Sequence, residues 1–471
     1  MMKAMTRVCL PDPRPWPPGL PMSRRHWFGL ATAALATPWA LAAAPARSRG
    51  IQLPPLPLRE RRLANGLQVI SLASQATASV SVQVWYRVGS KDDPAGRSGF
   101  AHLFEHLMFK RTQHMPDEMF DRLTEDVGGQ NNAFTAEDMT VYQNEVPFNH
   151  LERLLWAEAE RLAHLQVDQA NFESERKVVI EELRERVLAD PYGRLFNALP
   201  AQGFEVHPYR RPGIGNEAEL NAATLADVRA FHSTYYRPDN AVLVVVGDFD
   251  AAQFDAWVDR YFGPLRTPTE PIPRVTAVEP ARAQDARVAL TAPNVPLPAV
   301  ALLWKGPRAA HADAAALRMA SALLSGGDSS RLNETLVHDT QMAQSAGFSA
   351  DLYADAGLLG AYAIAASGQP LAKLEASLLA QIQRLAERGP DAAELDKVRT
   401  QLLTSTISGR QTPQGLADAL GNAVLLLGDA RMADRTLQQL QAVQAADVQR
   451  VLKQHVLQTR RMTVEYTQAA A

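Results

Sequence analysis

The sequence predicts a mixed α/β (α+β) protein made of two homologous α/β sandwich domains in tandem. Three observations support this prediction. Strand-like runs of β-branched residues occur together with longer helix-like segments. A proline-rich segment of low periodicity, residues 264–286, divides the body of the chain. The segment that closes the first half also recurs at the end of the second half. At a constant offset of 220, Leu220 matches Leu440, Asp227 matches Asp447, Val228 matches Val448, and Val244 matches Val464.

Length and composition narrow the class of protein. The chain has 471 residues, of which 46% are hydrophobic, enough for more than one core. Its net charge is −3 with both signs well mixed, which excludes the basic footprint of a nucleic-acid binder. The single cysteine, Cys9, precedes the predicted mature start, so the body can hold neither a disulfide framework nor a cysteine-based metal site.

Residues 1–46 are predicted to be an export signal and disordered leader. Arg24 and Arg25 precede a weakly apolar stretch, and small residues near its end offer cleavage sites at Ala42, Ala44 or Ala46. The run "SRRHWF" resembles a twin-arginine signal, and Met22 is an alternative start. An uncleaved anchor is the other interpretation, although Pro38 and the many alanines make a poor membrane span. The expected location is the periplasm.

The first half, residues 47–263, contains both strand-like and helix-like patterns. "RRLANGLQVISL" predicts a hairpin around Asn65-Gly66. Alternating apolar residues from Val80 to Tyr86 predict a half-buried strand. "NAVLVVVGDFD", residues 240–250, predicts a buried strand that ends this half. Helical patterns cover residues 99–111, 117–127, 148–165 and 171–188. After the linker at 264–286, residues 287–471 form the second predicted domain.

The segment "GFAHLFEHLMFKR", residues 99–111, places three ionisable side chains in an otherwise apolar helical pattern. His102 and His106 share one helix face, Glu105 lies on the adjoining strip, and Ser98 is expected to cap the helix start. Burying two imidazoles and a carboxylate is costly unless each is satisfied, and a divalent metal satisfies them. Imidazole and carboxylate ligands with an open position are typical of catalytic zinc. The alternatives are a core helix whose histidines bond to backbone and a polar stripe that faces solvent.

A catalytic zinc ion needs a third protein ligand, and the helical pattern at residues 171–188 offers one. Glu175 and Glu182 are seven residues apart and therefore share a face, with Val178 and Val179 between them. A charged surface helix is the other interpretation, because three further glutamates lie in the same segment. The isolated histidines are weaker candidates for ligands: His114, His150, His164, His207 and His232.

The helix motif and the second carboxylate helix resemble one family. "HLFEH", followed 76 residues later by Glu182 in "ERKVVIEEL", resembles the pitrilysin, insulinase and mitochondrial processing peptidase family of inverted-motif zinc peptidases. The likeness extends from "RRLANGLQV" to the last strand. It implies one zinc ion per chain, held by His102, His106 and Glu182. It implies Glu105 as general base for the attack of zinc-bound water on a peptide bond, and Glu175 as a supporting catalytic carboxylate.

The resemblance also implies how substrate is held. "GGQNNAFTAEDMTVYQNEVP", residues 128–147, is expected to form a Gly-Gly turn and one strand that includes Phe134 and Met139. In the family, the strand matching "NAFT" lies beside the zinc and pairs with substrate backbone, so Asn132 and Ala133 would supply that edge here. Backbone pairing implies unfolded peptides as substrates. A plain edge strand is the alternative.

The second half is expected to carry the fold without a metal site. No H-x-x-E-H occurs in residues 287–471, and at the constant offset the metal positions fall on Ala322, Ser325 and Gly326. This domain is expected to form the other wall of a peptidase chamber. Active relatives often carry an arginine and a tyrosine after "SSRL", where this chain has His338 and Ser345.

The missing arginine–tyrosine pair implies a partner. A homologous chain would supply the pair in a heterodimer, or a second copy would complete a homodimer, and the two chains together would enclose the chamber. A non-catalytic peptide-binding or structural subunit of the same fold is the alternative function.

Overall fold

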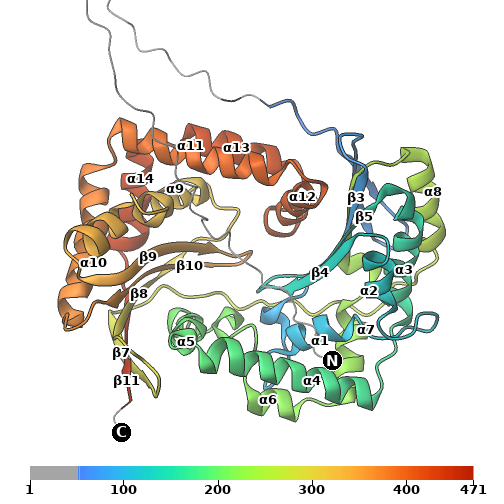
Figure 1. Cartoon of the computed structure of the whole chain (residues 1–471), viewed down its shortest axis with the longest axis horizontal. Helices are drawn as coiled ribbons and strands as arrows, with labels where there is room; N and C mark the ends of the chain where they lie inside the picture. The colour runs from blue at the N-terminus through green and yellow to red at the C-terminus, as the bar shows by residue number, and fades with distance from the viewer. Residues whose placement is uncertain (1–50, 52, 470–471) are drawn as a thin grey trace, which may run out of the picture. The chain divides into compact units, whose positions relative to one another are not determined.

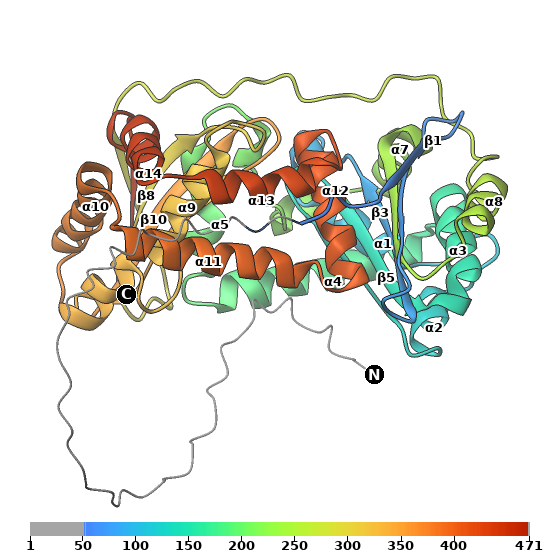
Figure 2. The same ribbon diagram turned by 90° about the horizontal axis from the view of Figure 1, so that it is seen from above.

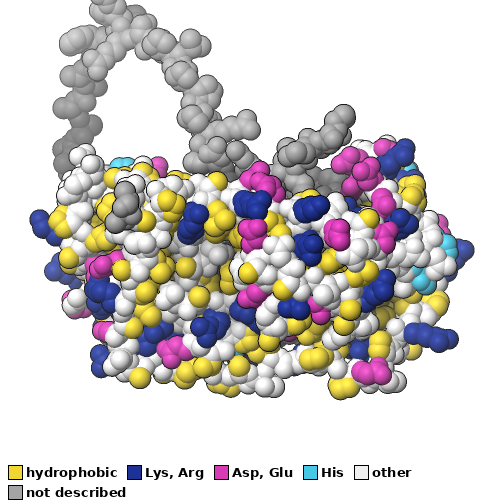
Figure 3. Space-filling model, turned by 90° about the horizontal axis from the view of Figure 1, so that it is seen from below, with side chains coloured by type: hydrophobic (Ala, Val, Ile, Leu, Met, Phe, Trp, Pro, Cys, Tyr) yellow, Lys and Arg dark blue, Asp and Glu magenta, His cyan; other side chains and the backbone are white. Residues whose placement is uncertain are grey.

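A computed structural model describes residues 51 and 53–469, and the leader with its predicted export signal lies outside this part of the chain. Its strands form two sheets, each with helices packed on it (Figure 1). Among these residues, no helix is both long enough and apolar enough to cross a membrane. On the face drawn in Figure 3, basic and acidic side chains are interspersed, in agreement with the small net charge.

The first sheet has the strand order β1-β2-β6-β3-β5-β4. Its strands are β1 (Arg59–Arg62), β2 (Gln68–Ala73), β3 (Ser79–Tyr86), β4 (Gln130–Thr135), β5 (Thr140–Pro147) and β6 (Ala241–Gly247). The α-helices of this half are α1 (Phe100–Leu107), α2 (Met119–Glu125), α3 (Leu151–His164), α4 (Gln169–Leu183), α5 (Gly193–Gly203), α6 (Glu217–Ala222), α7 (Leu225–Tyr235) and α8 (Ala251–Tyr261). Short 3₁₀ or π turns are η1 (Ser90–Asp92), η2 (Phe148–His150), η3 (Arg184–Ala189), η4 (Pro208–Arg210) and η5 (Pro238–Asn240).

Two local predictions for this sheet have different outcomes. The hairpin at Asn65-Gly66 is confirmed: β1 and β2 pair antiparallel, and Gly66 takes the left-handed φ of 92° that its turn needs. The single strand expected in residues 128–147 is wrong. The segment forms two antiparallel strands, β4 and β5, because the chain reverses in a turn closed by a bond from the Ala136 N–H to the Met139 carbonyl.

The second sheet has the order β7-β11-β8-β10-β9. Its strands are β7 (Ala286–Ala292), β8 (Ala299–Gly306), β9 (Ala343–Leu352), β10 (Gly357–Ala365) and β11 (Met462–Gln468). The helices of this half are α9 (Ala314–Ser325), η6 (Asn333–Asp339), α10 (Leu371–Arg388), α11 (Ala392–Gly409), α12 (Pro413–Leu427), α13 (Met432–Ala442), α14 (Ala445–Leu452) and η7 (Lys453–Leu457).

The sequence repeat corresponds to equivalent elements of the two halves. Helices α7 and α14 both begin with a capping box that has an aspartate at helix position N3, Asp227 in α7 and Asp447 in α14. Each helix leads into the last strand of its half, which pairs parallel with an earlier strand: β6 with β2, and β11 with β7. The predicted pair of tandem α/β domains is therefore present.

Each half covers a sheet face of the other half. Helix α12 packs on the first sheet, where Leu420 and Val424 join Trp85 and Val244 in one buried cluster (Figures 1 and 2). In the other direction, α5 contacts β8 and β11 of the second sheet. The half-buried strand predicted from the alternation at 80–86 is therefore wrong. Strand β3 is buried on both faces, because α12 covers the side that the pattern left polar.

The proline-rich segment 264–286 has no helix or strand before β7 begins, and it crosses between the halves (Figure 2). It is anchored at Glu279, whose carboxylate accepts hydrogen bonds from the backbone N–H groups of Glu205, Val206 and His207 at 2.7–3.1 Å. The Lys305 ammonium lies 2.6 Å from the same carboxylate. The Glu279 carboxylate therefore ties the connection to both halves.

Candidate metal centre

Helix α1 presents its polar side chains from a core position. Phe100, Leu103, Phe104 and Leu107 are all at most 1% exposed and anchor the helix in the first half's core. The helix begins at Gly99, which adopts a left-handed φ of 87°. A side chain there would meet the backbone of Ile214 and Gly215, so the close approach requires glycine.

The predicted cap at Ser98 is wrong. The Ser98 hydroxyl donates to the Pro212 carbonyl instead. The buried Asp93 carboxylate accepts from the N–H groups of Gly99 and Ala101, both at 2.8 Å, and so satisfies the first turn of α1. Burial raises the pKa of Asp93 to about 7, against the lowering effect of these backbone hydrogen bonds.

Helix α4 supplies two carboxylates to the same place. It starts at Asp168, whose side chain accepts from the Asn171 N–H at 2.9 Å. Phe172, Val179 and Ile180 hold one side of the helix in the core. Because Glu175 and Glu182 lie two turns apart, both face α1, and the structure brings together the residues that the sequence singled out.

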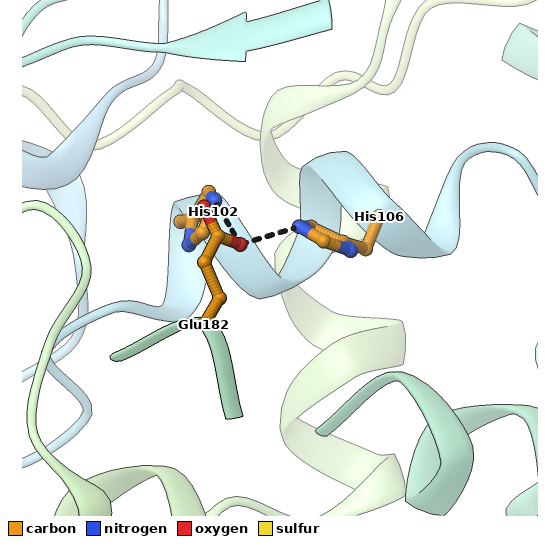
Figure 4. A group of neighbouring side chains, drawn as sticks. All are labelled: His102, His106 and Glu182. Carbon is orange, nitrogen blue, oxygen red and sulfur yellow. Dashed lines mark ion pairs between the residues drawn. The ribbon is translucent and has the colours of Figure 1, made fainter. Parts of the chain in front are cut away.

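Three donor atoms converge between the two helices (Figure 4). Glu182 Oε2 lies 3.6 Å from His102 Nε2 and 3.5 Å from His106 Nε2. The two imidazole rings are perpendicular, with centroids 4.9 Å apart. One ligand atom from each residue lies within 4.8 Å of the others. The side chains are 7–17% exposed, so the group is largely buried but still reached by solvent.

These residues fit a zinc ion. Zinc bonds to nitrogen and oxygen of about 2.0–2.2 Å in a tetrahedron set neighbouring ligand atoms about 3.3–3.6 Å apart. The observed separations of 3.5 and 3.6 Å match that spacing and are too long for hydrogen bonds. Two imidazoles and one carboxylate, with a further position open, are the donor set of a catalytic zinc site.

The electrostatics of the two histidines differ. Burial, together with the neighbouring His106, lowers the pKa of His102 to about 4, so His102 is neutral and can donate a lone pair. Burial also disfavours a charged His106, but the carboxylates of Glu175 and Glu182, each 3.5 Å from its ring, raise its pKa to about 9. A metal ion therefore competes with a proton at His106.

Two basic side chains hold the carboxylates in place. Glu175 Oε2 lies 3.5 Å from His106 Nδ1, while its Oε1 pairs with the Lys110 ammonium at 2.8 Å. Glu182 points Oε2 at the histidines, and its Oε1 pairs with Arg186 at 2.6 Å. Arg186 belongs to η3, a π-helical turn directly after α4. Such outer contacts orient metal ligands.

Glu105 is buried beside this group. It is 9% exposed, and its Oε2 accepts a hydrogen bond of 2.6 Å from the Thr135 hydroxyl of β4. Burial raises the pKa of Glu105 to about 7, although the Thr135 bond and the nearby His106 act in the opposite direction. A carboxylate with a pKa near neutrality can both accept and return a proton.

Strand β4 lies at the edge of the first sheet, next to α1. One side of β4 pairs with β5, and no described strand pairs with the other side. Asn132 is exposed and Ala133 partly buried. The edge position agrees with the expectation for these two residues, and their contact with substrate stays a prediction.

Residues 287–469 of the second half lack this arrangement. Ala322 and Ser325 lie in α9 and Gly326 directly follows it, and none of the three has a metal-binding side chain of the histidine or carboxylate kind. A different group, His311, Asp313 and His455, lies near the start of the same helix. There Asp313 is paired with Arg450 and His455, each at 2.8 Å, and its N–H bonds to His311 Nδ1, so these groups satisfy one another.

Four residues of the site were not found from the sequence: Asp93, Lys110, Thr135 and Arg186. Lys110 and Arg186 each lie four residues after a predicted ligand, on the same helical face, and this spacing was a usable signal. Thr135 stands in the quoted "NAFT" run, but nothing local indicated that its hydroxyl reaches α1. Asp93 bonds across a loop, for which no spacing rule exists.

The comparisons with known protein families cover both halves. Residues 68–217 match the family described as insulinase (peptidase family M16), and residues 222–402 match a family described as the peptidase M16 inactive domain. The second match begins in the last part of the first half and extends into the second half, and it does not include α1 or α4.

Individual relatives are similar over most of the chain. The zinc protease PqqE of Helicobacter pylori is 32% identical over 408 residues, which cover 85% of this chain and 91% of that protein. A probable mitochondrial-processing peptidase subunit beta of Arabidopsis thaliana is 25% identical over 406 residues, covering 84% and 76%. Among solved structures, a protease from Helicobacter pylori superposes with a TM-score of 0.84 at 30% identity, covering 88% of this chain and all of that one.

Proposed function

This chain belongs to peptidase family M16, the insulinase family, and on that premise we propose that it is a zinc-dependent endopeptidase or oligopeptidase that hydrolyses unfolded peptides. The observation that carries the proposal is the convergence of His102 Nε2, His106 Nε2 and Glu182 Oε2 from two helices. These three residues would hold one zinc ion per chain. Zinc, when bound, supplies Lewis-acid chemistry, acidifying water and polarising a peptide carbonyl.

The protein's own groups move the proton. Glu105 accepts it from the attacking water, and the protonated carboxyl then gives it to the leaving nitrogen. Its pKa of about 7 suits both steps. Glu175 is assigned to orient His106, with Lys110 holding its other oxygen.

Substrate would be held by strand addition. A peptide pairing with the open edge of β4 at Asn132 and Ala133 would run beside α1, which carries the metal-binding histidines. Because β4 would form hydrogen bonds with the peptide backbone, the bound peptide must be extended. Folded proteins are therefore excluded as substrates. This reasoning favours unfolded peptides over native proteins as substrates.

We assign residues 47–263 as the zinc-carrying domain, 264–286 as the linker and 287–471 as the homologous domain without zinc. His338 and Ser345 occupy the positions where active relatives often carry an arginine and a tyrosine. A homologous partner chain would supply that pair and close the chamber, with a homodimer as the second arrangement. One similar protein is named as a subunit, the processing peptidase subunit beta.

Export is part of the proposal. The arginine pair at Arg24 and Arg25, the apolar stretch and the small residues after it support a twin-arginine or general signal peptide. The mature chain would then act in the periplasm. Its body contains no cysteine, so it needs no oxidative folding there.

A second function is a non-catalytic peptide-binding or structural subunit. The observation that favours it is the match of residues 222–402 to a domain described as inactive. The described first half nevertheless keeps both histidines, Glu182 and Glu105. A chain that only binds peptide has no need of a buried carboxylate with a neutral pKa beside the metal position.

The test is hydrolysis of an internally quenched, unstructured peptide by purified residues 47–471 loaded with zinc. Glu105→Gln should bind zinc in the wild-type ratio and lose turnover. Glu173→Gln, the same change on a partly exposed residue of α4, is the matched control and should stay active; among the described residues its carboxylate bonds only to Gln169. Zinc-loaded wild type without turnover, both by itself and with a homologous chain added, would support the non-catalytic subunit instead.

A further inference from the structure

The general-base candidate is held by one hydrogen bond. Thr135 Oγ1 donates to Glu105 Oε2 at 2.6 Å, and within residues 53–469 no other hydrogen bond to this carboxylate is present. A short O–H···O⁻ bond is charge-assisted and is stronger than a bond between neutral groups. Glu105 has three rotatable side-chain bonds, so this contact decides where its second oxygen points.

Thr135 is mounted on a rigid element. It is the last residue of β4 and lies directly opposite Thr140 of β5. The preceding Phe134 packs edge-on against the buried Trp85, with ring centroids 6.1 Å apart. The following Ala136 bonds through its N–H to Met139 and through its carbonyl to the Ser90 N–H. The residues before and after Thr135 are therefore both held in place, which fixes the backbone that carries its hydroxyl.

We propose that Thr135 is a positioning residue that aims the Glu105 carboxylate, so that the strand offered to the substrate also sets the general base. The inference rests on the proposed function, because Glu105 is the base only in a peptidase. It connects substrate binding at β4 with the position of the general base. The substrate would pair with β4, and Glu105 is hydrogen-bonded to β4. Both are therefore positioned by the same strand. Thr135 itself acts only through Glu105.

The test compares Thr135→Val, which removes the hydroxyl at nearly constant volume, with Thr135→Ser, which keeps it. Losing a hydrogen bond to a charged group predicts a fall in kcat of about 10- to 100-fold for Thr135→Val. KM should be unchanged, because the side chain faces Glu105 and the substrate meets backbone. Thr135→Ser should restore most of kcat.

The matched control is Thr140→Val. Thr140 is fully buried, lies opposite Thr135 and donates its hydroxyl to the Val88 carbonyl. Removing that hydroxyl perturbs the same strand pair without touching Glu105, so kcat should stay at the wild-type value. Zinc content, measured for every variant, should be one per chain throughout.

A second readout does not depend on turnover. Crystal structures of metal-free wild type, Thr135→Val and Thr135→Ser should show Glu105 in one rotamer with the hydroxyl present and displaced or split without it. An unmoved Glu105 in Thr135→Val, a kcat within about twofold of wild type, or a serine variant as slow as the valine variant would overturn the inference. If wild type hydrolyses nothing, the proposed function fails, and the crystal structures still decide the role of Thr135.

Discussion

Substituting alanine for Gly421 tests the docking of α12 on the first sheet. A Cβ at this position would lie 2.1 Å from Trp85 Cε2 and 2.3 Å from Cζ2. Carbon atoms in contact sit about 3.5–4.0 Å apart, so ring and helix must separate by about 1.5 Å. The ring has little freedom, because its Nε1 donates to Gln83 at 2.9 Å and Phe134 packs against it.

The size of the effect follows from two opposing contributions. In an unconstrained helix interior, Gly→Ala stabilises by up to about 1 kcal/mol. Overpacking a well-filled core costs about 1–3 kcal/mol, and the clash here is with a fully buried ring. Asp418 also anchors this helix by accepting from the amides of Gln83 and Gln143. A separation of 2.1 Å calls for the upper end of the overpacking cost, so after the helix gain is subtracted we expect Gly421→Ala to lower the free energy of unfolding by about 2–3 kcal/mol.

The assay is equilibrium unfolding in urea, followed by tryptophan fluorescence. With a slope of about 3 kcal/mol per molar urea, the midpoint of the first transition should fall by about 0.7–1 M. Gly409→Ala is the matched control: it is the last residue of α11, its Cβ would meet nothing within 4 Å, and it should leave the midpoint unchanged or slightly higher. Equal midpoints for the two variants would refute the docking argument.

Three further predictions concern the metal centre and the linker. Glu175→Gln should weaken zinc binding by about 10- to 100-fold, because His106 loses its orienting carboxylate; chelator competition measures this, and an affinity within twofold of wild type would contradict it. Zinc at 100 times its Kd should stabilise the fold by about 2.7 kcal/mol, seen as a higher Tm than in chelator and absent in His102→Ala. For Glu279, burial acts to raise the pKa, but Lys305 and the backbone N–H groups of residues 205–207 outweigh it and lower the pKa. Its stabilisation is therefore complete above the unfolded pKa of about 4.3 and is lost as pH falls through the lower folded value. Glu279→Gln should have a lower Tm than wild type at pH 7, and the gap should close below about pH 4; a gap independent of pH would argue against the role.

The local parts of the fold could be predicted from the sequence. Helices α1 and α4 were expected over residues 99–111 and 171–188, and the structure has them at Phe100–Leu107 and Gln169–Leu183, the latter continuing into η3. The Asn65-Gly66 hairpin and the buried strand β6 followed from turn chemistry and from a run of valines. In each case the residues that determine the element lie within a few helical turns or within one strand.

Contacts between distant segments could not be predicted. The burial of β3 depends on α12, more than 300 residues later in the chain, and the polar face of Gln83 is satisfied there by Asp418. The cap of α1 comes from Asp93 across a loop, where a neighbouring serine was the plausible local choice. The spacing of the histidines indicated a metal, but the bond from Thr135 to Glu105 depends on how a strand meets a helix.

The exchange of α5 and α12 between the halves bears on how this protein can be divided. A cut within residues 264–286 removes only a covalent connection, whereas each fragment then carries a sheet whose cover belongs to the other fragment. The two fragments produced separately would expose these faces and aggregate, while the same two fragments produced together would assemble on each other. The halves are thus mutually dependent folding units, and a gene split at the linker would yield an obligate pair of subunits.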